Sequence, residues 1–343
     1  MLTKLDPYSS YIGPEEMSGF RNAVESQFGG VGIQITADQG QLIVSSPLVG
    51  TPAYRAGVQS GDRILEIDGE STHNLTVDAA AKRLKGEIGA TVNFTVRHPL
   101  TGENQSFTLK RELIHVDTVL GNSRKSDDAW DFMLDPQQRI GYIRVTAFSR
   151  DTGADLKKAL EELQHEKVRG LVLDLRFNPG GLLTAAIEVC DLFIREGRIV
   201  STQGRNTEER VWDAGKGSKF EGFPMVVLVN RYSASASEIV AACLQDHQRA
   251  VIVGERTWGK GSVQNVVELE DGKSALKLTT ATYTRPNGHN IHRFPEAKET
   301  DEWGVKPNPG FEVRLNIDEL NDLIADRRQR DIVQTHESHA AET

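Results

Sequence analysis

The sequence has few cysteines, no long apolar run and no excess of basic residues. Two cysteines, Cys190 and Cys243, occur among 343 residues, each in an apolar helical pattern. We interpret them as buried free thiols, and they do not decide the redox compartment. No run of 18 apolar residues is present, so we expect no transmembrane segment. The net charge of −9 argues against a nucleic-acid partner, because such proteins usually carry a basic face.

The first ten residues, MLTKLDPYSS, lack the apolar stretch of a signal peptide. Two explanations stay open, a cytoplasmic protein and an export segment upstream of this sequence. The apolar fraction of 38% and the charged fraction of 26% are ordinary for a soluble globular protein. The length suits two or three domains.

Composition and periodicity divide the chain into segments of different character. Glycine-punctuated apolar runs and a predicted helix over 76–85 indicate a small α+β domain. After an irregular polar stretch at 114–138, strands alternate with helices, which is typical of an α/β layered domain. The expected segments are a short helical N-terminal one (1–27), the α+β domain (28–113), the α/β domain (114–315) and a charged helical tail (316–343).

The first candidate for chemistry is the segment VVLVNRYSASASEIVAACLQD. An apolar strand ends, small residues turn the chain, and a helix begins near Ser235. Hydrolases use this strand–turn–helix arrangement to present a nucleophile at the positive end of a helix. Ser235 and Glu238 also have the spacing of a capping box, which needs no catalysis. Both interpretations stay open on this segment alone.

The second candidate is Lys260 in the segment VGERTWGKGSVQ. Its flanking glycines allow close approach of a ligand, and Trp258 could remove water from the amine. A lysine acts as a general base only when neutral, and burial lowers its pKa from about 10.4. The alternatives are a surface-loop lysine and a phosphate-binding loop. The phosphate-loop pattern fails, because Gly261 stands where serine or threonine is required.

The third candidate is the glycine pair in LVLDLRFNPGGLLTAA. Backbone N–H groups around Gly180 and Gly181 could face an anion at the start of the following helix, although an ordinary turn would look similar. A hydroxyl, an amine and free N–H donors on three successive turns favour a hydrolase. The nine histidines form no metal-binding pattern, so we expect neither a metal nor another cofactor.

At these residues the chain resembles the carboxyl-terminal processing peptidases, also called tail-specific proteases. The resemblance runs from LDPYSSYIGPEE to GVKPNPG. Its most specific parts are SASASEI, GKGSVQ and DLRFNPGG, together with the PDZ-like stretch that begins FGGVGIQI. The fold that it implies is mixed α/β: a crotonase-like peptidase core with an inserted PDZ domain and a short N-terminal helical segment.

The resemblance implies a role for each matching residue. Ser235 would be the nucleophile, Lys260 its base, and Gln264 the residue that orients the amine. The supporting positions are Arg176, Gly180, Gly181, Glu238 and Asp246. Gly30, Val31, Gly32 and Ile33 match the loop of a PDZ domain that binds the carboxylate of a peptide.

The implied function is serine endoproteolysis near the C-termini of extracytoplasmic proteins, either periplasmic or secreted. Its partners would be protein or peptide substrates held by their tails, and homo-oligomerisation or an adaptor stays open. A second hypothesis is a catalytically inactive PDZ scaffold that only binds peptides. Acyl-CoA chemistry on a crotonase-like core is a weaker third hypothesis, because a PDZ domain has no role there.

Overall fold

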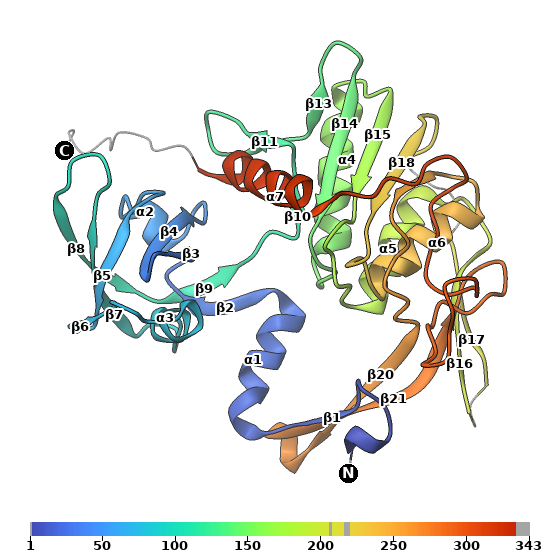
Figure 1. Ribbon diagram of the computed structural model, residues 1–343, viewed down its shortest axis with the longest axis horizontal. Helices are drawn as coiled ribbons and strands as arrows, with labels where there is room; N and C mark the ends of the chain where they lie inside the picture. Colours follow the sequence, from blue (N-terminus) through green and yellow to red (C-terminus); the bar gives the residue numbers. More distant parts are fainter. Residues whose placement is uncertain (1, 206–207, 216–219, 334–343) are drawn as a thin grey trace. The chain divides into compact units, whose positions relative to one another are not determined.

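The computed structural model describes residues 2–205, 208–215 and 220–333 (Figure 1). The chain divides into two compact units. Unit 1 consists of Met1–Ser26, Asp117–Asn122 and Phe132–Arg314. Unit 2 consists of Gln27–Val116, Ser123–Asp131 and Leu315–Thr343. Each unit is therefore assembled from three separate stretches of sequence.

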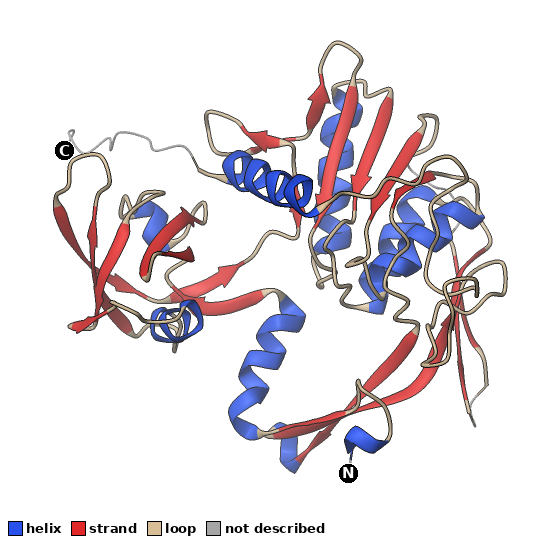
Figure 2. Ribbon diagram, in the orientation of Figure 1, coloured by secondary structure: helices blue, strands red, loops and turns tan. Residues whose placement is uncertain are grey.

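The central sheet of unit 1 is mostly parallel and alternates with helices (Figure 2). Its parallel strands are β14 (Ile140–Val145), β15 (Gly170–Asp174), β18 (Met225–Val229) and β19 (Val251–Gly254). The helices between them are α4 (Thr152–His165), α5 (Leu183–Phe193) and α6 (Ala236–Asp246). Strand order follows chain order, so right-handed crossovers put the three helices on one face of the sheet. Consistent with this, α5 packs against both α4 and α6.

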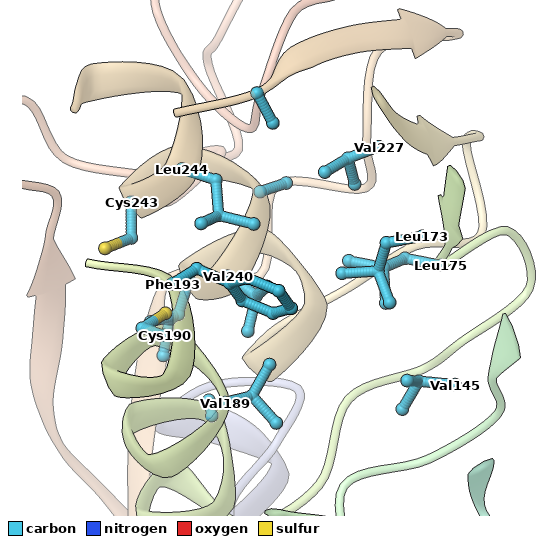
Figure 3. Close-up of a cluster of buried hydrophobic side chains, with 14 of the residues drawn as sticks. Val145, Leu173, Leu175, Val189, Cys190, Phe193, Val227, Val240, Cys243 and Leu244 are labelled. Carbon is cyan, nitrogen blue, oxygen red and sulfur yellow. The ribbon is translucent and has the colours of Figure 1, made fainter. Parts of the chain in front are cut away.

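The main hydrophobic core lies between these helices and the sheet. Figure 3 shows Leu173 and Val227 from the strands near Val240 and Phe193 from the helices. All four side chains are buried. Removing each from water contributes about 1.5 to 3 kcal/mol, which stabilises the packing of the helices on the sheet. Both cysteines are buried and free, as the sequence predicted.

A second, antiparallel sheet completes unit 1. Its strands are β1 (Ser10–Ile12), β16 (Arg198–Gly204), β17 (Arg210–Asp213), β20 (Ser262–Leu269) and β21 (Ser274–Thr284). The longest strand, β21, pairs with β1, β16 and β20 and so joins the N-terminal segment to the rest of the unit. Helix α1 (Pro14–Glu25) packs Met17 and Phe20 against Ile12 and Ala275.

Unit 2 is a twisted antiparallel sheet with helices beside it. The strand order is β3 (Ile33–Asp38), β4 (Gln41–Pro47), β5 (Arg63–Ile67), β7 (Thr91–Arg97) and β8 (Asn104–Lys110), with β6 (Glu70–Ser71) paired to β5. The helices are α2 (Pro52–Arg55), α3 (Val77–Leu84) and α7 (Ile317–Asp331). Strand β2 (Gln27–Gly30) pairs with β9 (Glu112–His115). Helix α7, from the tail that the sequence set apart, packs against strand β11 (Ser123–Arg124) in this unit.

The stretch 114–138 is more regular than the sequence predicted. Besides the end of β9 it contains β10 (Val119–Leu120), β11 (Ser123–Arg124), β12 (Trp130–Asp131) and β13 (Met133–Asp135). Strands β10 and β13 both pair with β14. The prediction that 114–138 is irregular was therefore wrong. A strand of two or three residues is too short to show the alternation of apolar and polar residues by which strands are predicted.

Candidate active site

Ser235 lies on a strained turn between strand β18 and helix α6. Its backbone has φ 57° and ψ −114°, a conformation that non-glycine residues rarely adopt. Such strain persists only where the surroundings enforce it, and the nucleophile elbow of hydrolases is one such place. Gly180 packs directly beneath this turn, since a Cβ atom there would lie 2.8 Å from Ser235 Cβ. A larger residue at position 180 would displace the turn.

The three serines of the turn differ in what their hydroxyl groups contact. Ser233 Oγ donates to the carbonyl oxygen of Leu175 at 2.8 Å, and Ser237 Oγ donates to that of Asn178 at 2.9 Å. In the described part of the chain, no carbonyl oxygen accepts a hydrogen bond from Ser235 Oγ. The hydroxyls of Ser233 and Ser237 are therefore structural, while that of Ser235 is available for chemistry.

A second hydroxyl group connected with Ser235 is the phenol of Tyr283, on strand β21. The Ser235 side chain is one of the groups that act on the Tyr283 phenol. Burial raises the pKa of Tyr283 to about 12, and the contact with Ser235 opposes this rise. The phenol is therefore neutral near pH 7 and can donate to, or accept from, the serine. The sequence gives no local sign of Tyr283, because Ser235 is far from it in the chain.

Glu238 connects the Ser235 turn to the loop that carries Lys260. Its fully buried carboxylate accepts four hydrogen bonds. Oε2 accepts from the N–H groups of Ser235 and Lys260, both at 2.8 Å, and Oε1 accepts from Gly259 N–H at 2.6 Å and from Thr257 Oγ1 at 2.5 Å. Burial raises the pKa of Glu238, and these hydrogen bonds oppose that rise. Glu238 caps the helix as its spacing predicts, but it also fixes the second loop.

The Lys260 loop is packed on its other side against residues 291–305. Gly259 and Gly261 permit this contact, because Cβ atoms there would lie 2.7 Å from Arg293 Cβ and 2.3 Å from His292 N. Thr257 N–H donates to the carbonyl oxygen of Val305 at 3.1 Å. Arg256, whose guanidinium stacks over Trp303, donates to that residue's carbonyl oxygen at 3.0 Å. The loop is thus held between α6 and this later segment.

The environment of the Lys260 amine favours its neutral form. Burial lowers the pKa of Lys260, the positive charge of Lys277 lowers it further, and the negative charge of Glu238 opposes both. The amine nitrogen lies 5.1 Å from the centre of the Tyr8 ring. Among the described residues, no hydrogen bond joins the Ser235 hydroxyl to the Lys260 amine. The two residues are linked through the carboxylate of Glu238.

Gln264, expected to orient the lysine, contacts hydroxyl groups instead. Its amide nitrogen donates to Ser262 Oγ at 2.9 Å and to Thr279 Oγ1 at 3.2 Å. In this structure the amide therefore belongs to a network between strands β20 and β21. Thr279 Oγ1 in turn donates to Asp6 Oδ1 at 2.9 Å, which connects this network to the N-terminal segment.

The expected oxyanion glycines lie against the Ser235 turn, but only one of them has a free N–H group. Gly180 N–H donates to Asn178 Oδ1 at 2.8 Å and is already used. The N–H groups of Gly181 and Ala236 have no acceptor among the described residues. Ala236 directly follows the serine at the start of α6, where hydrolases place an oxyanion donor. The sequence analysis missed Ala236, although its position after the serine was a usable signal.

Two expected supporting residues have other structural roles. Arg176 forms a bidentate ion pair with the buried Asp174, at 3.0 and 2.6 Å. Asp246 lies eleven positions after Ser235 at the opposite end of α6, about 16 Å along the helix axis. Its carboxylate pairs with Arg285 at 2.6 and 2.9 Å. Asp246 is thus not beside the serine or the lysine.

The expected peptide-binding residues lie where strand β2 ends and edge strand β3 begins. Gly32 has φ 79° and contacts Thr51 so closely that a Cβ atom would lie 2.3 Å from its side chain. Only glycine fits this position without displacing Thr51.

Among the described residues, no group of three or more histidine, cysteine, aspartate or glutamate side chains could hold a metal ion. In the same residues no helix is long and apolar enough to cross a membrane.

The parallel sheet, the serine elbow and the buried lysine loop define a hydrolase core, and comparisons with known proteins agree. The model of "Peptidase family S41" matches residues 139–308, and that of "PDZ domain" matches residues 22–97. A carboxy-terminal-processing protease from Bartonella bacilliformis is 37% identical over 338 residues, which are 96% of this chain and 75% of that protein. A carboxyl-terminal-processing protease from Synechocystis is 40% identical, over 86% of this chain and 67% of that protein.

A solved structure has the same organisation. The photosystem II D1 C-terminal processing protease superposes with a TM-score of 0.52 at 31% identity, over 92% of this chain and 79% of that one. The chain therefore belongs to the carboxyl-terminal processing proteases of peptidase family S41. It is a serine-type peptidase with a PDZ domain, and the predicted fold class is confirmed.

Proposed function

We propose that this protease cleaves proteins near their C-termini with a Ser–Lys dyad. Ser235 is the nucleophile, Lys260 in its neutral form is the general base, and the PDZ domain binds the substrate tail. The observation that carries the proposal is the shared carboxylate of Glu238, which ties the strained backbone of Ser235 to the backbone of Lys260. Because both backbones bind one carboxylate oxygen, the nucleophile and the base lie on adjacent turns.

The chemistry follows from the groups present. Lys260 Nζ removes the proton from Ser235 Oγ as this oxygen attacks the carbonyl carbon of the scissile peptide bond. The N–H groups of Ala236 and Gly181 stabilise the oxyanion of the tetrahedral intermediate, and losing one such donor costs about 3 to 4 kcal/mol. The lysine ammonium then gives its proton to the leaving amine, and the acyl-enzyme remains. Water, deprotonated by the same amine, hydrolyses the ester and restores the serine.

The buried surroundings of Lys260 support its role as the base. Each pH unit by which an amine's pKa exceeds the ambient pH costs about 1.4 kcal/mol for deprotonation. Burial and the charge of Lys277 both reduce that cost. Gln264 supports the dyad through strand β21 and the N-terminal segment, since its amide reaches Thr279.

Recognition of the tail is proposed for the loop Gly30–Ile33 and strand β3. A peptide can add as a further strand to β3, which is an edge of its sheet, while N–H groups of the loop hold the terminal carboxylate. Because the family usually acts outside the cytoplasm, we propose extracytoplasmic substrates and an extracytoplasmic location.

The test is cleavage of an unfolded, fluorescently labelled protein with an apolar, free C-terminus. Wild type is expected to cleave it, and Ser235→Ala and Lys260→Arg are expected to be inactive, because guanidinium cannot become a base near neutrality. Ser233→Ala and Ser237→Ala are the matched controls and should retain cleavage while losing about 1 kcal/mol of stability each.

A second arm tests recognition of the tail. The same labelled protein ending in an amide or in aspartate should be cleaved more slowly than the free apolar tail. Cleavage by Ser235→Ala at the wild-type rate would contradict the dyad. If wild type binds the tails but cleaves none of the proteins, the hypothesis of a catalytically inactive PDZ scaffold is favoured.

A further inference from the structure

The amine of Lys260 faces an aromatic ring from the opposite end of the chain. Tyr8 belongs to the short N-terminal stretch before strand β1. The centre of its ring lies 5.1 Å from Lys260 Nζ. Both side chains are partly buried. A cation within about 6 Å of an aromatic ring face is attracted by the ring's quadrupole, and the attraction grows when water is excluded.

The turn that carries Tyr8 is fixed by a carboxylate. Asp6 Oδ1 accepts hydrogen bonds from the N–H groups of Tyr8 at 2.8 Å and of Ser9 at 2.9 Å. The same oxygen accepts from Thr279 Oγ1 on β21 at 2.9 Å, and Ser9 Oγ accepts from Thr279 N–H at 3.0 Å. The turn that carries Tyr8 is therefore bound to Thr279 of strand β21, through the side chains of Asp6 and Ser9.

The network continues to the expected helper of the dyad. Thr279 Oγ1, which binds Asp6, also accepts from the Gln264 amide. Strand β1 follows Tyr8 directly and pairs with β21 through Ser10 and Lys277. The N-terminal turn and Gln264 of strand β20 thus share Thr279 of strand β21 as a hydrogen-bond partner.

Two charged groups from other elements act on the amine. Glu238 on α6 favours the ammonium form, and Lys277 on β21 disfavours it. Asp6 lies in the Tyr8 turn, and its charge acts on His292, whose backbone packs against Gly261. The Tyr8 ring is a neutral neighbour that attracts the charged amine more than the uncharged one.

We propose that Tyr8 is a positioning residue for Lys260, with its ring face binding the ammonium ion and holding the amine in place between catalytic cycles. This inference rests on the proposed dyad for its kinetic meaning, but the contact itself can be tested separately. The ring stabilises the charged amine and so sets how readily Lys260 becomes a base. Tyr8 contributes through its aromatic face, and its hydroxyl group is not required.

The test compares Tyr8→Leu, Tyr8→Phe and the control Tyr11→Leu in the full chain. Leucine keeps an apolar side chain over the amine but removes the ring, phenylalanine keeps the ring, and Tyr11 is an exposed tyrosine on neighbouring strand β1. The titration of the Lys260 amine is measured by competitive acetylation with isotope-labelled acetic anhydride, read by mass spectrometry on the peptide that contains Lys260. Only the neutral amine reacts.

Tyr8→Leu is expected to lower the acetylation midpoint of Lys260 by about half a pH unit, since the charged form loses its aromatic partner. Tyr8→Phe and Tyr11→Leu are expected to keep the wild-type midpoint. An unchanged or raised midpoint in Tyr8→Leu would overturn the inference and leave the proposed dyad intact.

Kinetics separate this inference from the proposed function. In Tyr8→Leu the rising limb of kcat/KM against pH should shift to lower pH by the same amount as the acetylation midpoint. The plateau of kcat should fall while KM stays constant, because the amine is less well placed. If the acetylation midpoint shifts but the kinetic limb does not follow, the contact is supported and Lys260 is not the base.

Discussion

The backbone N–H groups of Ser235 and Lys260 donate to the same oxygen atom, Oε2 of Glu238, each at 2.8 Å. A single buried carboxylate therefore sets the distance between the two segments of the candidate dyad. Its second oxygen is also occupied, by Gly259 and Thr257. All four donors need an acceptor, because an unsatisfied buried N–H group costs about 1 to 3 kcal/mol.

Glu238→Gln tests the shared carboxylate without changing the size of the side chain, since the two side chains are nearly isosteric. The glutamine NH2 group must face two of the four donors, so the Lys260 loop should loosen and kcat should fall by about tenfold or more. The melting temperature should also decrease. Glu166→Gln, at an exposed position after α4, is the control and should change neither quantity. A fully active Glu238→Gln enzyme would show that the shared carboxylate is dispensable.

Lys277→Gln tests the charge that acts on the base. Removing this positive charge should raise the pKa of Lys260, because the ammonium form is no longer repelled. The rising limb of kcat/KM should then move to higher pH, by roughly half a unit. The exposed Lys273→Gln is the matched control. A limb that stays in place, or moves to lower pH, would argue against Lys260 as the titrating group.

Tyr283→Phe removes only the hydroxyl group of a tyrosine on which Ser235 acts. If the phenol orients the serine for attack, kcat should fall by about tenfold, an effect of about 1.4 kcal/mol. KM should stay nearly constant, because the ring still fills its buried position. The measurement is steady-state cleavage alongside thermal melting, with Tyr11→Phe as the control. Unchanged kcat would make Tyr283 a packing residue only.

His98 in unit 2 should make stability depend on pH. Its ring nitrogens lie 2.6 Å from Asp62 Oδ1 and 2.7 Å from Gln105 Oε1. Burial lowers the pKa of His98, but these two contacts and the nearby negative charges raise it above the usual value overall. A raised pKa stabilises the folded state below the unfolded-state value of about 6.5, and this contribution disappears as the pH rises through the folded-state pKa.

The corresponding experiment measures urea unfolding of wild type and His98→Gln at about pH 5 and about pH 9, on either side of the histidine range. The loss of stability in the variant should be larger at the lower pH. His73→Gln, an exposed histidine in the same unit, should show no such difference. Equal losses at both pH values would contradict the predicted linkage.

Local sequence patterns were sufficient for the long elements. The helix predicted over 76–85 is α3 (Val77–Leu84), and the helix predicted to begin near Ser235 is α6 (Ala236–Asp246). Apolar residues at helical spacing and clear end signals carry this information within one segment. The two-residue strands β10 to β12 were not predictable, because their pairing depends on distant partners.

The candidate site shows the same division between local and distant information. Ser235, Lys260 and the glycine pair could be singled out, because each lies on a turn with its own sequence signal. Tyr283 and Tyr8 could not, since the chain gives no local sign of what a tyrosine will face. Asp246 was named from the resemblance alone, and it lies at the other end of helix α6 from Ser235.

The support of the Lys260 loop by residues 291–305 matters for anyone who wants to shorten the chain. Ser235, Lys260, Gln264 and Tyr283 would all be present in a protein that stopped after strand β21. Such a fragment would lack the Val305 carbonyl oxygen that accepts from Thr257 and the Trp303 ring beneath Arg256. It would contain every reactive group but would lack the segment that packs against the Lys260 loop. A minimal version of unit 1 therefore has to extend to Arg314.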